Sequence, residues 1–488
     1  MGGILISLGI TAVAQRGEPL PLRELQQFAN VFAAIKNTYV EPLTDQALVN
    51  NAIKGLFTDL DPHSAYLDAD AFKEMEAMTQ GGFGGLGIEI GSEDGMPKVI
   101  SPIEDTPAAR AGILAGDIIT HINGKPTKDL SLNDAVKRMR GEPNTKVTLT
   151  ILRKDESRSF PVTITRTEIK TQSVKAKMIE PGYGWVRVSQ FQERTVDDFV
   201  RKVEDLYKQD PNLKGLVLDL RNDPGGLLDA AVAISAAFLQ PNVTVVTTDG
   251  QLAESKAIFR ASPEFYARRG SDPIKSLPAA IKNIPLVVLV NEGSASASEI
   301  VSGALQDHKR ATIMGAQTFG KGSVQTVRPL GPDTGIKLTT ARYYTPSGKS
   351  IQAKGIVPDI MVDESAEGDL FAALRTREAD LEKHLSSGQG PEVKDEAREK
   401  AREAALKRLD EESKKPASER RPPEFGSDKD FQLQQALHQL KGEPVQVSQT
   451  KTERPAEKKD EEKTSASDKP AESNTDDTKL PPATEPKK

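Results

Sequence analysis

Residues 284–305 read IPLVVLVNEGSASASEIVSGAL, and this stretch decides the fold of the central part of the chain. Its first seven residues form a nearly continuous apolar run, which is typical of a strand buried on both faces of a sheet. Small residues follow, and from about Ser296 to Leu305 the apolar spacing becomes that of a helix. A strand, a small-residue turn and a helix in this order indicate a layered α/β domain.

The same alternation extends over residues 182–362. The pattern predicts helices at 195–208 and 230–239, and it predicts further strands at 184–191, 216–220, 243–248, 312–315, 324–328 and 336–344. We therefore expect one α/β domain over this region.

The flanking regions have other patterns. Residues 22–39 and 45–57 carry apolar side chains at helical spacing and predict a helical hairpin, whose apolar faces would equally suit a dimer contact. Short alternating strands with turns follow, and residues 364–415 and 431–440 are helical by pattern. The tail has almost no apolar content and should be disordered. The expected organisation is a signal segment (1–14), a helical region (20–80), a β-rich domain (81–168), an α/β core (169–362), a helical region (363–441) and a disordered tail (442–488).

Bulk composition excludes several classes of function. The chain has 488 residues with a net charge of −6, so no basic excess argues for nucleic acid. It has no cysteine, which removes disulfides and thiolate chemistry. None of the five histidines are at the i, i+4 spacing of a helical zinc pair, so we expect no metal and no cofactor.

The N-terminus, residues 1–14, is a short apolar stretch that ends in Ala12-Val13-Ala14. It is too short to span a bilayer and lacks the positive start of a complete signal peptide. We expect part of an export signal or an uncleaved membrane anchor, and the alternative is a frayed apolar terminus.

Ser296 is the candidate nucleophile. It lies in the small-residue turn Asn291-Glu-Gly-Ser-Ala-Ser-Ala-Ser-Glu299 at the start of a helix, where free N–H groups and the helix dipole favour negative charge. Acyl transfer develops such charge in its tetrahedral intermediate. The alternative is that these serines only cap the helix.

A serine nucleophile needs a base. His308 lies about three turns from Ser296 at the far end of the helix, and His63 lies in a turn with Asp61 and Ser64. Lys321, in Phe319-Gly-Lys-Gly-Ser-Val-Gln325, would serve if burial kept its amine neutral, with Gln325 orienting it. The alternative is an ordinary loop lysine.

Residues 220–227, LRNDPGGL, follow another buried strand. The Gly225 and Gly226 N–H groups, together with that of Ala297, would make an oxyanion hole. The alternative is a turn that opens the next helix.

Taken together, these motifs resemble the carboxyl-terminal processing, or tail-specific, proteases, a family with a serine nucleophile and a lysine base. GSASASE matches the nucleophile segment, and FGKGSVQ matches the lysine segment with its orienting glutamine at Gln325. The two segments place Ser296 and Lys321 25 residues apart, which agrees with the family. RNDPGG is similar to the oxyanion segment, except that Asp223 stands where asparagine is common. The family also has a segment like LDPHSAYL at 60–67.

The resemblance implies a crotonase/Clp-like layered α/β core with an inserted PDZ domain. Gly85-Leu86-Gly87-Ile88 matches the carboxylate-binding loop, which would hold the C-terminal tail of a protein substrate, and Arg140 resembles a sensor residue. It also implies an endopeptidase in the periplasm, with a lipoprotein adaptor as a partner in some relatives. Amphipathic segments 22–39 and 431–440 suggest a homo-oligomer.

Two other functions remain open at this point. One is a PDZ scaffold or chaperone with an inert catalytic domain. The other is an acyl-coenzyme A enzyme on a crotonase-type core, in which neither the PDZ-like insert nor Lys321 would have a place.

Overall fold

The computed structural model describes residues 20–448 except 94, 104–105, 129, 154–157, 171, 269, 367, 369–374 and 391–424. The predicted export segment, 1–14, therefore lies outside the described residues, and the predicted disordered tail is described only as far as Ser448. Among the helices of the described part, none is long and apolar enough to cross a membrane.

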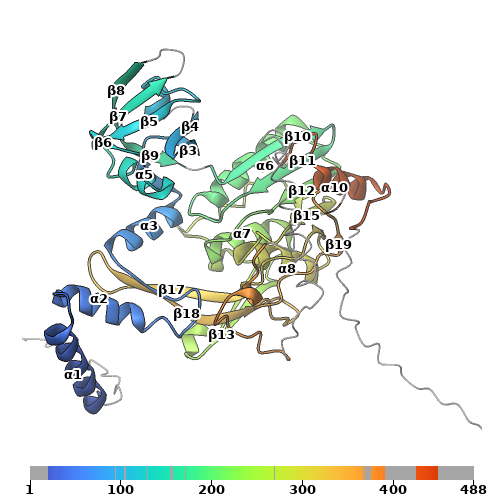
Figure 1. Ribbon diagram of the computed structural model, residues 1–488. Coiled ribbons are helices and arrows are strands. Elements are labelled where there is room, and N and C mark those ends of the chain that lie inside the picture. Colours follow the sequence, from blue (N-terminus) through green and yellow to red (C-terminus); the bar gives the residue numbers. More distant parts are fainter. Residues whose placement is uncertain are drawn as a thin grey trace, which may run out of the picture. The chain divides into compact units, whose positions relative to one another are not determined.

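The N-terminal region is helical, as its periodicity predicted (Figure 1). It contains α1 (Leu22–Thr38), α2 (Asp45–Gly55), the short strand β1 (Ala65–Leu67) and α3 (Ala69–Gln80). Side-chain oxygens of Thr44 and Asp68 accept N–H groups in the first turns of α2 and α3, which explains where these helices begin. α3 ends at Gly81, which has a left-handed φ of 75°.

The β-rich region forms a separate small core. Its main sheet has the order β3-β4-β5-β7-β8, with β6 paired to β5, and β2 pairs with β9 outside this sheet. Alternating inward residues such as Val147, Leu149 and Ile151 are fully buried, which explains the period-two pattern of the sequence. Its elements are β2 (Gly82–Gly85), β3 (Ile88–Glu93), β4 (Met96–Pro102), α4 (Pro107–Arg110), β5 (Ile118–Ile122), β6 (Lys125–Pro126), α5 (Leu132–Met139), β7 (Lys146–Arg153), β8 (Arg158–Thr165) and β9 (Thr167–Lys170).

The α/β core is built on a six-stranded sheet of order β10-β11-β12-β15-β16-β19, parallel except for the β10/β11 pair. Its strands are β10 (Val174–Glu180), β11 (Tyr183–Val188), β12 (Gly215–Asp219), β15 (Leu286–Val290), β16 (Thr312–Gly315) and β19 (Ile360–Met361). Its helices are α6 (Thr195–Gln209), α7 (Leu228–Phe238), α8 (Ala297–Asp307) and α10 (Phe431–Lys441).

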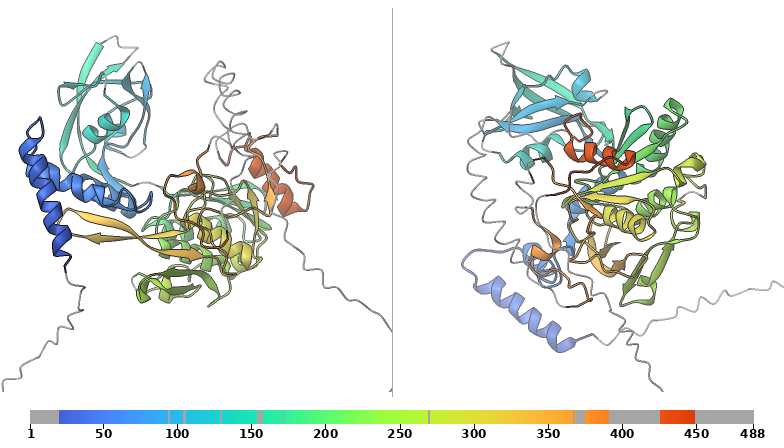
Figure 2. Two further views of the ribbon diagram at one scale, coloured as in Figure 1. Left: turned by 60° about the horizontal axis from the view of Figure 1, so that its bottom comes forward. Right: turned by 90° about the vertical axis from the view of Figure 1, so that its right-hand side faces the viewer.

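Both faces of this sheet are covered. Leu216, Leu218 and Val288 belong to the same core cluster as α6, α7 and α8, whereas Val217 and Leu289 belong to the cluster that contains α10 (Figure 2). Successive side chains of a strand point to opposite faces. A strand covered on both faces is therefore apolar along most of its length. Residues 216–220 and 286–290 are buried as predicted, with Asp219 as the one charged side chain among them, whereas Pro285 is exposed.

The strands at 243–248, 324–328 and 336–344 are correctly predicted, but they do not join the parallel sheet. They form an antiparallel sheet of order β1-β18-β13-β14, with β17 paired to β18 (Figure 1). β17 pairs along its whole length with residues 335–342 of β18, which makes a hairpin, and a hairpin requires antiparallel strands. This sheet contains β13 (Thr244–Gly250), β14 (Ala257–Arg260), β17 (Ser323–Pro329) and β18 (Gly335–Tyr344); the short turns nearby are η2 (Ala253–Ser255), η3 (Pro263–Phe265) and η4 (Ala279–Lys282).

The long helix predicted over 364–415 is wrong for residues 375–390. These residues form turns around one short 3-10 helix, η6 (Glu378–Asp380), and residues 391–424 lie outside the described part. Charged composition favoured a helix, but Glu378 and its neighbours bind back onto the core instead, through bonds such as Glu378 N–H to Phe319 O (3.0 Å).

α10 confirms the predicted helix at 431–440 but not its predicted exposure. Leu433, Ala436 and Leu437 are buried, and the helix packs on the chain's own sheet. Its apolar face is therefore occupied within the chain and is not the oligomer surface that the sequence suggested.

A buried ion cluster fixes α10 to the end of β12. The Arg221 guanidinium donates to both carboxylate oxygens of Asp219 and of Asp430, at 2.6–2.9 Å, and stacks on Phe425. Asp430 also accepts the Leu433 N–H at the start of α10. Arg221 and Asp219 are almost completely buried, so each charge depends on the others.

We predict that Asp430→Ala lowers the free energy of unfolding by about 3–5 kcal/mol, because it leaves a buried guanidinium short of a counter-charge. Urea denaturation of the full chain measures this loss. The control is Asp205→Ala, which breaks the exposed Lys208 pair and should cost only about 0–1 kcal/mol. Equal effects of the two substitutions would contradict the prediction.

Candidate active site

Ser296 lies at the junction of β15 and α8, at the carboxyl end of a central parallel strand, where α/β folds place their sites. It precedes the first residue of α8 with φ 55° and ψ −111°, a conformation that non-glycine residues rarely adopt. Such strain is found where the surrounding structure holds a side chain in a required direction.

The Ser296 hydroxyl is hydrogen-bonded to Tyr343, with 3.0 Å between Oγ and the phenol oxygen. Tyr343 lies on β18, and its backbone N–H donates to Gly322 O. Burial raises the pKa of Tyr343 well above its ordinary value, so the phenol stays protonated. Tyr343 could not be identified from the sequence, because a single tyrosine in a strand has no distinguishing pattern.

Glu299 links the nucleophile segment to the lysine segment. Its buried carboxylate accepts the Ser296 N–H (2.8 Å) and the Lys321 N–H (2.9 Å) on the same oxygen. The other oxygen accepts the Thr318 hydroxyl (2.5 Å) and the Gly320 N–H (2.7 Å). Burial raises the pKa of Glu299 to about 7, although these four hydrogen bonds oppose the rise. The capping pattern S-x-x-E, from Ser296 to Glu299, is a sequence signal for the hydrogen bond between the Ser296 N–H and the Glu299 carboxylate.

Lys321 lies where its amine can become neutral near physiological pH. Burial, followed by the positive charge of Lys337, lowers the pKa of Lys321 to about 8. The carboxylates of Glu378, Glu299 and Asp61 limit this drop. Lys321 and Ser296 both belong to the described residues, and among these no hydrogen bond joins the Lys321 amine to the Ser296 hydroxyl.

Gln325 does not orient Lys321 in this structure. Its side-chain amide donates to Ser323 Oγ (3.0 Å) and Thr339 Oγ1 (3.2 Å). The pairing of β17 with β18 shifts register between Val324 and Gln325, and such irregularities redirect side chains. The predicted contact between Gln325 and the lysine amine is therefore absent between these described residues.

The glycine loop after β12 reaches Ser296, as predicted. Gly225 has φ 95°, and a Cβ there would lie only 2.7 Å from Ala297 N and from Ser296 Cβ. Only glycine allows this approach. Gly225 N–H, however, donates to Asp223 Oδ1 (2.8 Å), so this expected oxyanion donor is engaged within its own loop. Within the described residues, Gly226 N–H and Ala297 N–H have no hydrogen-bond partner.

The segment that contains Asp61, His63 and Ser64 lies beside the lysine loop. Asp61 accepts the N–H groups of His63 and Ser64 and the Ser64 hydroxyl, which confirms the predicted turn. It also accepts the Thr339 hydroxyl (3.0 Å). His63 Nε2 lies 2.8 Å from Glu378 Oε2, a contact that the sequence analysis did not predict.

His308 does not reach the nucleophile. It follows the last residue of α8, and its Nε2 lies 2.7 Å from Thr244 O. A helix of that length separates it from Ser296, in agreement with the sequence argument.

The predicted carboxylate-binding loop, Gly85-Leu86-Gly87-Ile88, connects β2 and β3 in the β-rich domain. Gly87 has φ 77°, and a Cβ there would lie 2.2 Å from Thr106, so glycine is required. Arg140 caps the end of α5 and lies 3.7 Å from the Glu74 carboxylate of α3.

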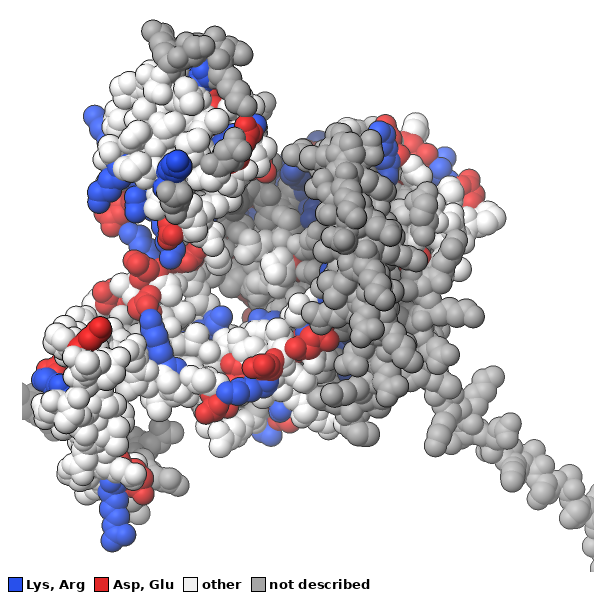
Figure 3. All heavy atoms as spheres, viewed as in Figure 1, with Lys and Arg blue, Asp and Glu red and all other residues white. Residues whose placement is uncertain are grey.

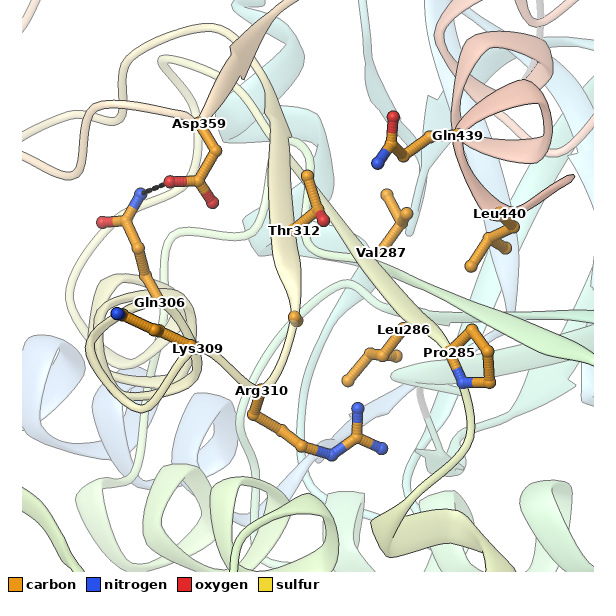
Figure 4. Close-up of a pocket in the computed structure, with 11 residues that line it drawn as sticks. Pro285, Leu286, Val287, Gln306, Lys309, Arg310, Thr312, Asp359, Gln439 and Leu440 are labelled. Carbon is orange, nitrogen blue, oxygen red and sulfur yellow. Dashed lines mark hydrogen bonds between the residues drawn. The ribbon is translucent and has the colours of Figure 1, made fainter. Parts of the chain in front are cut away.

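The described residues contain no cluster of three His, Cys, Asp or Glu side chains that could hold a metal ion. A pocket of about 420 Å³ opens between the end of α8 and the start of β15 and β16, lined by Gln306, Arg310 and Asp359 among others (Figure 4). It lies at the amino ends of the strands, opposite to the end where Ser296 is found. We do not assign the catalytic site to it.

Asp223 is the one departure from the family motif noted in the sequence, and its carboxyl is completely buried. Among the described residues its Oδ2 has no hydrogen-bond partner. Burial raises the pKa of Asp223 well above its ordinary range, against the hydrogen bond from Gly225 and the charge of Arg187; the Asp219 carboxylate adds to the rise. The folded chain therefore holds a proton that the unfolded chain releases above about pH 4.

We predict that Asp223→Asn stabilises the chain increasingly as pH rises from 5 to 8. A folded-state pKa above the unfolded value means that wild-type stability falls with rising pH, and asparagine removes this linkage. The gain should therefore be larger at pH 8 than at pH 5. Urea denaturation at both pH values measures it. Asp205→Asn is the exposed control, and a pH-independent difference for Asp223→Asn would refute the prediction.

Comparisons with known proteins agree with the motifs. Family models match as Peptidase family S41 over residues 182–362, PDZ domain over 98–153 and Activating protease CtpB N-terminal domain over 10–71. The chain is 45% identical over 370 residues to a carboxy-terminal-processing protease of Bartonella bacilliformis, covering 75% of this chain and 82% of that protein. It is 36% identical over 372 residues to a probable CtpA-like serine protease of Staphylococcus aureus, covering 74% and 71%.

A solved photosystem II D1 C-terminal processing protease is 30% identical, with a TM-score of 0.40, covering 70% of this chain and 93% of that one. The matches to curated proteins favour a peptidase over an inert scaffold or an acyl-coenzyme A enzyme. The chain belongs to the carboxyl-terminal processing proteases, serine-type peptidases of family S41 that carry a PDZ domain.

Proposed function

We propose that this peptidase is an endopeptidase that binds the C-terminal tails of exported proteins through its PDZ domain and cuts them with Ser296 and Lys321. The observation that carries the proposal is the Glu299 carboxylate, which accepts the backbone N–H groups of both residues on one oxygen. A base that is neutral in part at pH 7 supports it, because burial lowers the pKa of Lys321 to about 8.

The chemical steps follow from these groups. The Ser296 hydroxyl leaves Tyr343 and turns to the neutral Lys321 amine, which takes its proton as Oγ attacks the scissile carbonyl. Gly226 and Ala297 N–H groups receive the oxyanion, and Gly225 joins them once its N–H leaves Asp223. Lys321 then protonates the leaving amine, and an acyl-enzyme remains. Water deprotonated by Lys321 hydrolyses the ester, and Ser296 recovers its proton.

Gln325 would orient the lysine amine in the substrate-bound form of the enzyme. Its present partners, Ser323 and Thr339, are neutral hydroxyl groups, so exchanging them for the amine requires no charge separation.

Tail recognition would use the loop Gly85-Leu86-Gly87-Ile88. Backbone N–H groups there would bind the terminal carboxylate while the peptide extends the sheet edge at β3. Arg140 would couple binding to the active site through its contact with Glu74 on α3. Localisation in the periplasm and activation by a lipoprotein adaptor remain proposals that rest on the family resemblance; cell fractionation and pull-down from the periplasm would test them.

We predict that Ser296→Ala and Lys321→Ala each reduce cleavage of a loosely folded substrate by about 10⁴-fold or more, because nucleophile and base act as a unit. Wild-type kcat/KM should rise with pH through about 8, since the deprotonated amine is the active form. Gel-based cleavage assays from pH 6 to 10 measure both effects.

The matched control is Lys256→Ala, which changes an exposed lysine paired with Asp249 and should leave cleavage unchanged. Cleavage that survives in Ser296→Ala would rule out the proposed mechanism.

A substrate with an amidated C-terminus tests the role of the PDZ domain. Amidation should raise KM by about 10-fold or more, because a charged hydrogen-bond acceptor is lost.

We also propose that α1 forms a contact between copies of this chain. Leu22, Leu25, Phe28, Val31 and Ile35 are between 40% and 72% exposed along this helix. Mostly uncharged side chains cover the visible face of α1 in Figure 3. An apolar helical stripe of this length on one chain is unusual for a monomer.

We predict that the double change Phe28→Glu and Val31→Glu converts an oligomer into a smaller species in sedimentation velocity. The two introduced glutamate carboxylates would lose their water in the contact between α1 helices, which is energetically costly. Gln26→Glu on the same helix is the control and should keep the larger species. A wild-type chain that sediments only as a monomer would disprove the contact.

A further inference from the structure

Glu378 connects the segment 375–390 to both sides of Lys321. Its side chain is completely buried. Its backbone N–H donates to Phe319 O (3.0 Å), two residues before the lysine. Its Oε1 accepts the Gln352 side-chain amide (2.8 Å), and Gln352 Oε1 accepts the N–H of Gly322, the next residue after the lysine (2.9 Å). The carboxyl group of Glu378 is thus held at a fixed place next to the lysine loop.

The second oxygen of Glu378 has a titratable partner. His63 Nε2 lies 2.8 Å from Oε2, and the His63 side chain is 16% exposed. Protons can therefore reach His63 directly from solvent, whereas the buried Glu378 can exchange protons only through its hydrogen-bond partners. Histidine is the side chain whose charge ordinarily changes between pH 5 and 8.

Several charged or titratable groups face this site from the neighbouring elements. They are Asp61 and His63 from the N-terminal segment, Glu299 from α8, Lys337 and Tyr343 from β18, and Glu378. Of these, His63 and Glu378 form the one directly bonded acid–base pair among the described residues that face Lys321. The charge of the pair changes when His63 binds a proton.

We propose that His63 and Glu378 are positioning residues that tune the general base Lys321, with His63 making this tuning respond to pH; the proposal rests on the proposed function of Lys321. While His63 is neutral, the Glu378 carboxylate carries a full negative charge and stabilises the ammonium form of Lys321. Once His63 is protonated, the pair has no net charge and the ammonium form loses that stabilisation. Lys321 then releases its proton more easily, so the enzyme retains activity at lower pH.

A purely structural role for the pair gives a different expectation. The LDPHSAYL segment at 60–67 would then only brace the lysine loop, and loosening it would lower the rate equally at every pH. Tuning instead predicts changes that depend on pH: a lower Lys321 midpoint without the Glu378 charge, and a steeper acidic part of the titration without the His63 proton. The two roles are therefore separable by titration.

The test measures the Lys321 titration directly, by NMR of full-length Ser296→Ala enzyme labelled with ¹³C at the lysine ε carbon. Lys321→Met identifies the Lys321 signal. Glu378→Gln, which is isosteric and removes the negative charge, should lower the Lys321 pKa by about 0.5–1. His63→Gln keeps an amide donor at the Nε2 position but cannot be protonated, so Glu378 keeps its charge at every pH and the acidic part of the Lys321 titration should become steeper.

The matched control is His308→Gln, which removes a histidine at the far end of α8 and should leave the titration unchanged. Wild-type Lys321 should also titrate over a broader pH range than in His63→Gln, because two coupled groups give a broadened curve. This comparison needs only the partly exposed His63 to be changed, so it holds even if Glu378→Gln destabilises the fold.

The outcomes separate this inference from the proposed function. A lower Lys321 midpoint in Glu378→Gln together with a steeper acidic part of the titration in His63→Gln, followed by the acidic limb of kcat/KM in the Ser296 enzyme, supports both. The same changes without a matching change of the acidic limb support the tuning but reject Lys321 as the base. An unchanged Lys321 titration in either variant, with or without a lower rate, overturns the inference.

Discussion

The buried carboxylate of Glu299 is the interaction on which the active-site geometry depends. Burying a carboxylate is costly unless hydrogen bonds replace its water, and here four donors do so. Two of these donors are the backbone N–H groups of Ser296 and Lys321, so satisfying one side chain also fixes the backbone separation of the proposed nucleophile and base. The strained backbone of Ser296 is stabilised by the same bond, because Glu299 holds the N–H of that residue.

The parallel sheet supplies the second constraint. β12 and β15 are neighbours, so the loops that follow them meet at one edge of the sheet. Asn222 and Asn291, from these two loops, exchange backbone and side-chain hydrogen bonds at 2.8 Å, and Ala295 N–H donates to Asp223 O. The glycine loop after β12 and the segment that carries Ser296 are therefore joined by hydrogen bonds, and the Arg221 ion cluster ties the end of β12 to α10.

Three of the proposed catalytic groups have other hydrogen-bond partners in this structure. Ser296 binds Tyr343, Gln325 binds Thr339, and the Gly225 N–H binds Asp223. Each partner is neutral, or is a carboxyl whose pKa burial has raised, so each bond can be exchanged without separating buried charges. Catalysis would then require local side-chain and loop adjustments around a backbone that Glu299 already holds in place.

The sequence alone determined the elements that depend on local pattern: the strands and helices of the core, the small β domain, the turn that presents Ser296 and the glycine loop that approaches it. Periodicity and glycine positions report burial and backbone conformation over a few residues, so they suffice for such features. Only the tertiary structure decided that β13, β17 and β18 form a separate sheet, that α10 is buried, and that Glu378 meets His63 from 315 positions away. Pairings of this kind depend on which surfaces remain to be buried once the whole chain has folded, and no local pattern in a single sequence records that choice.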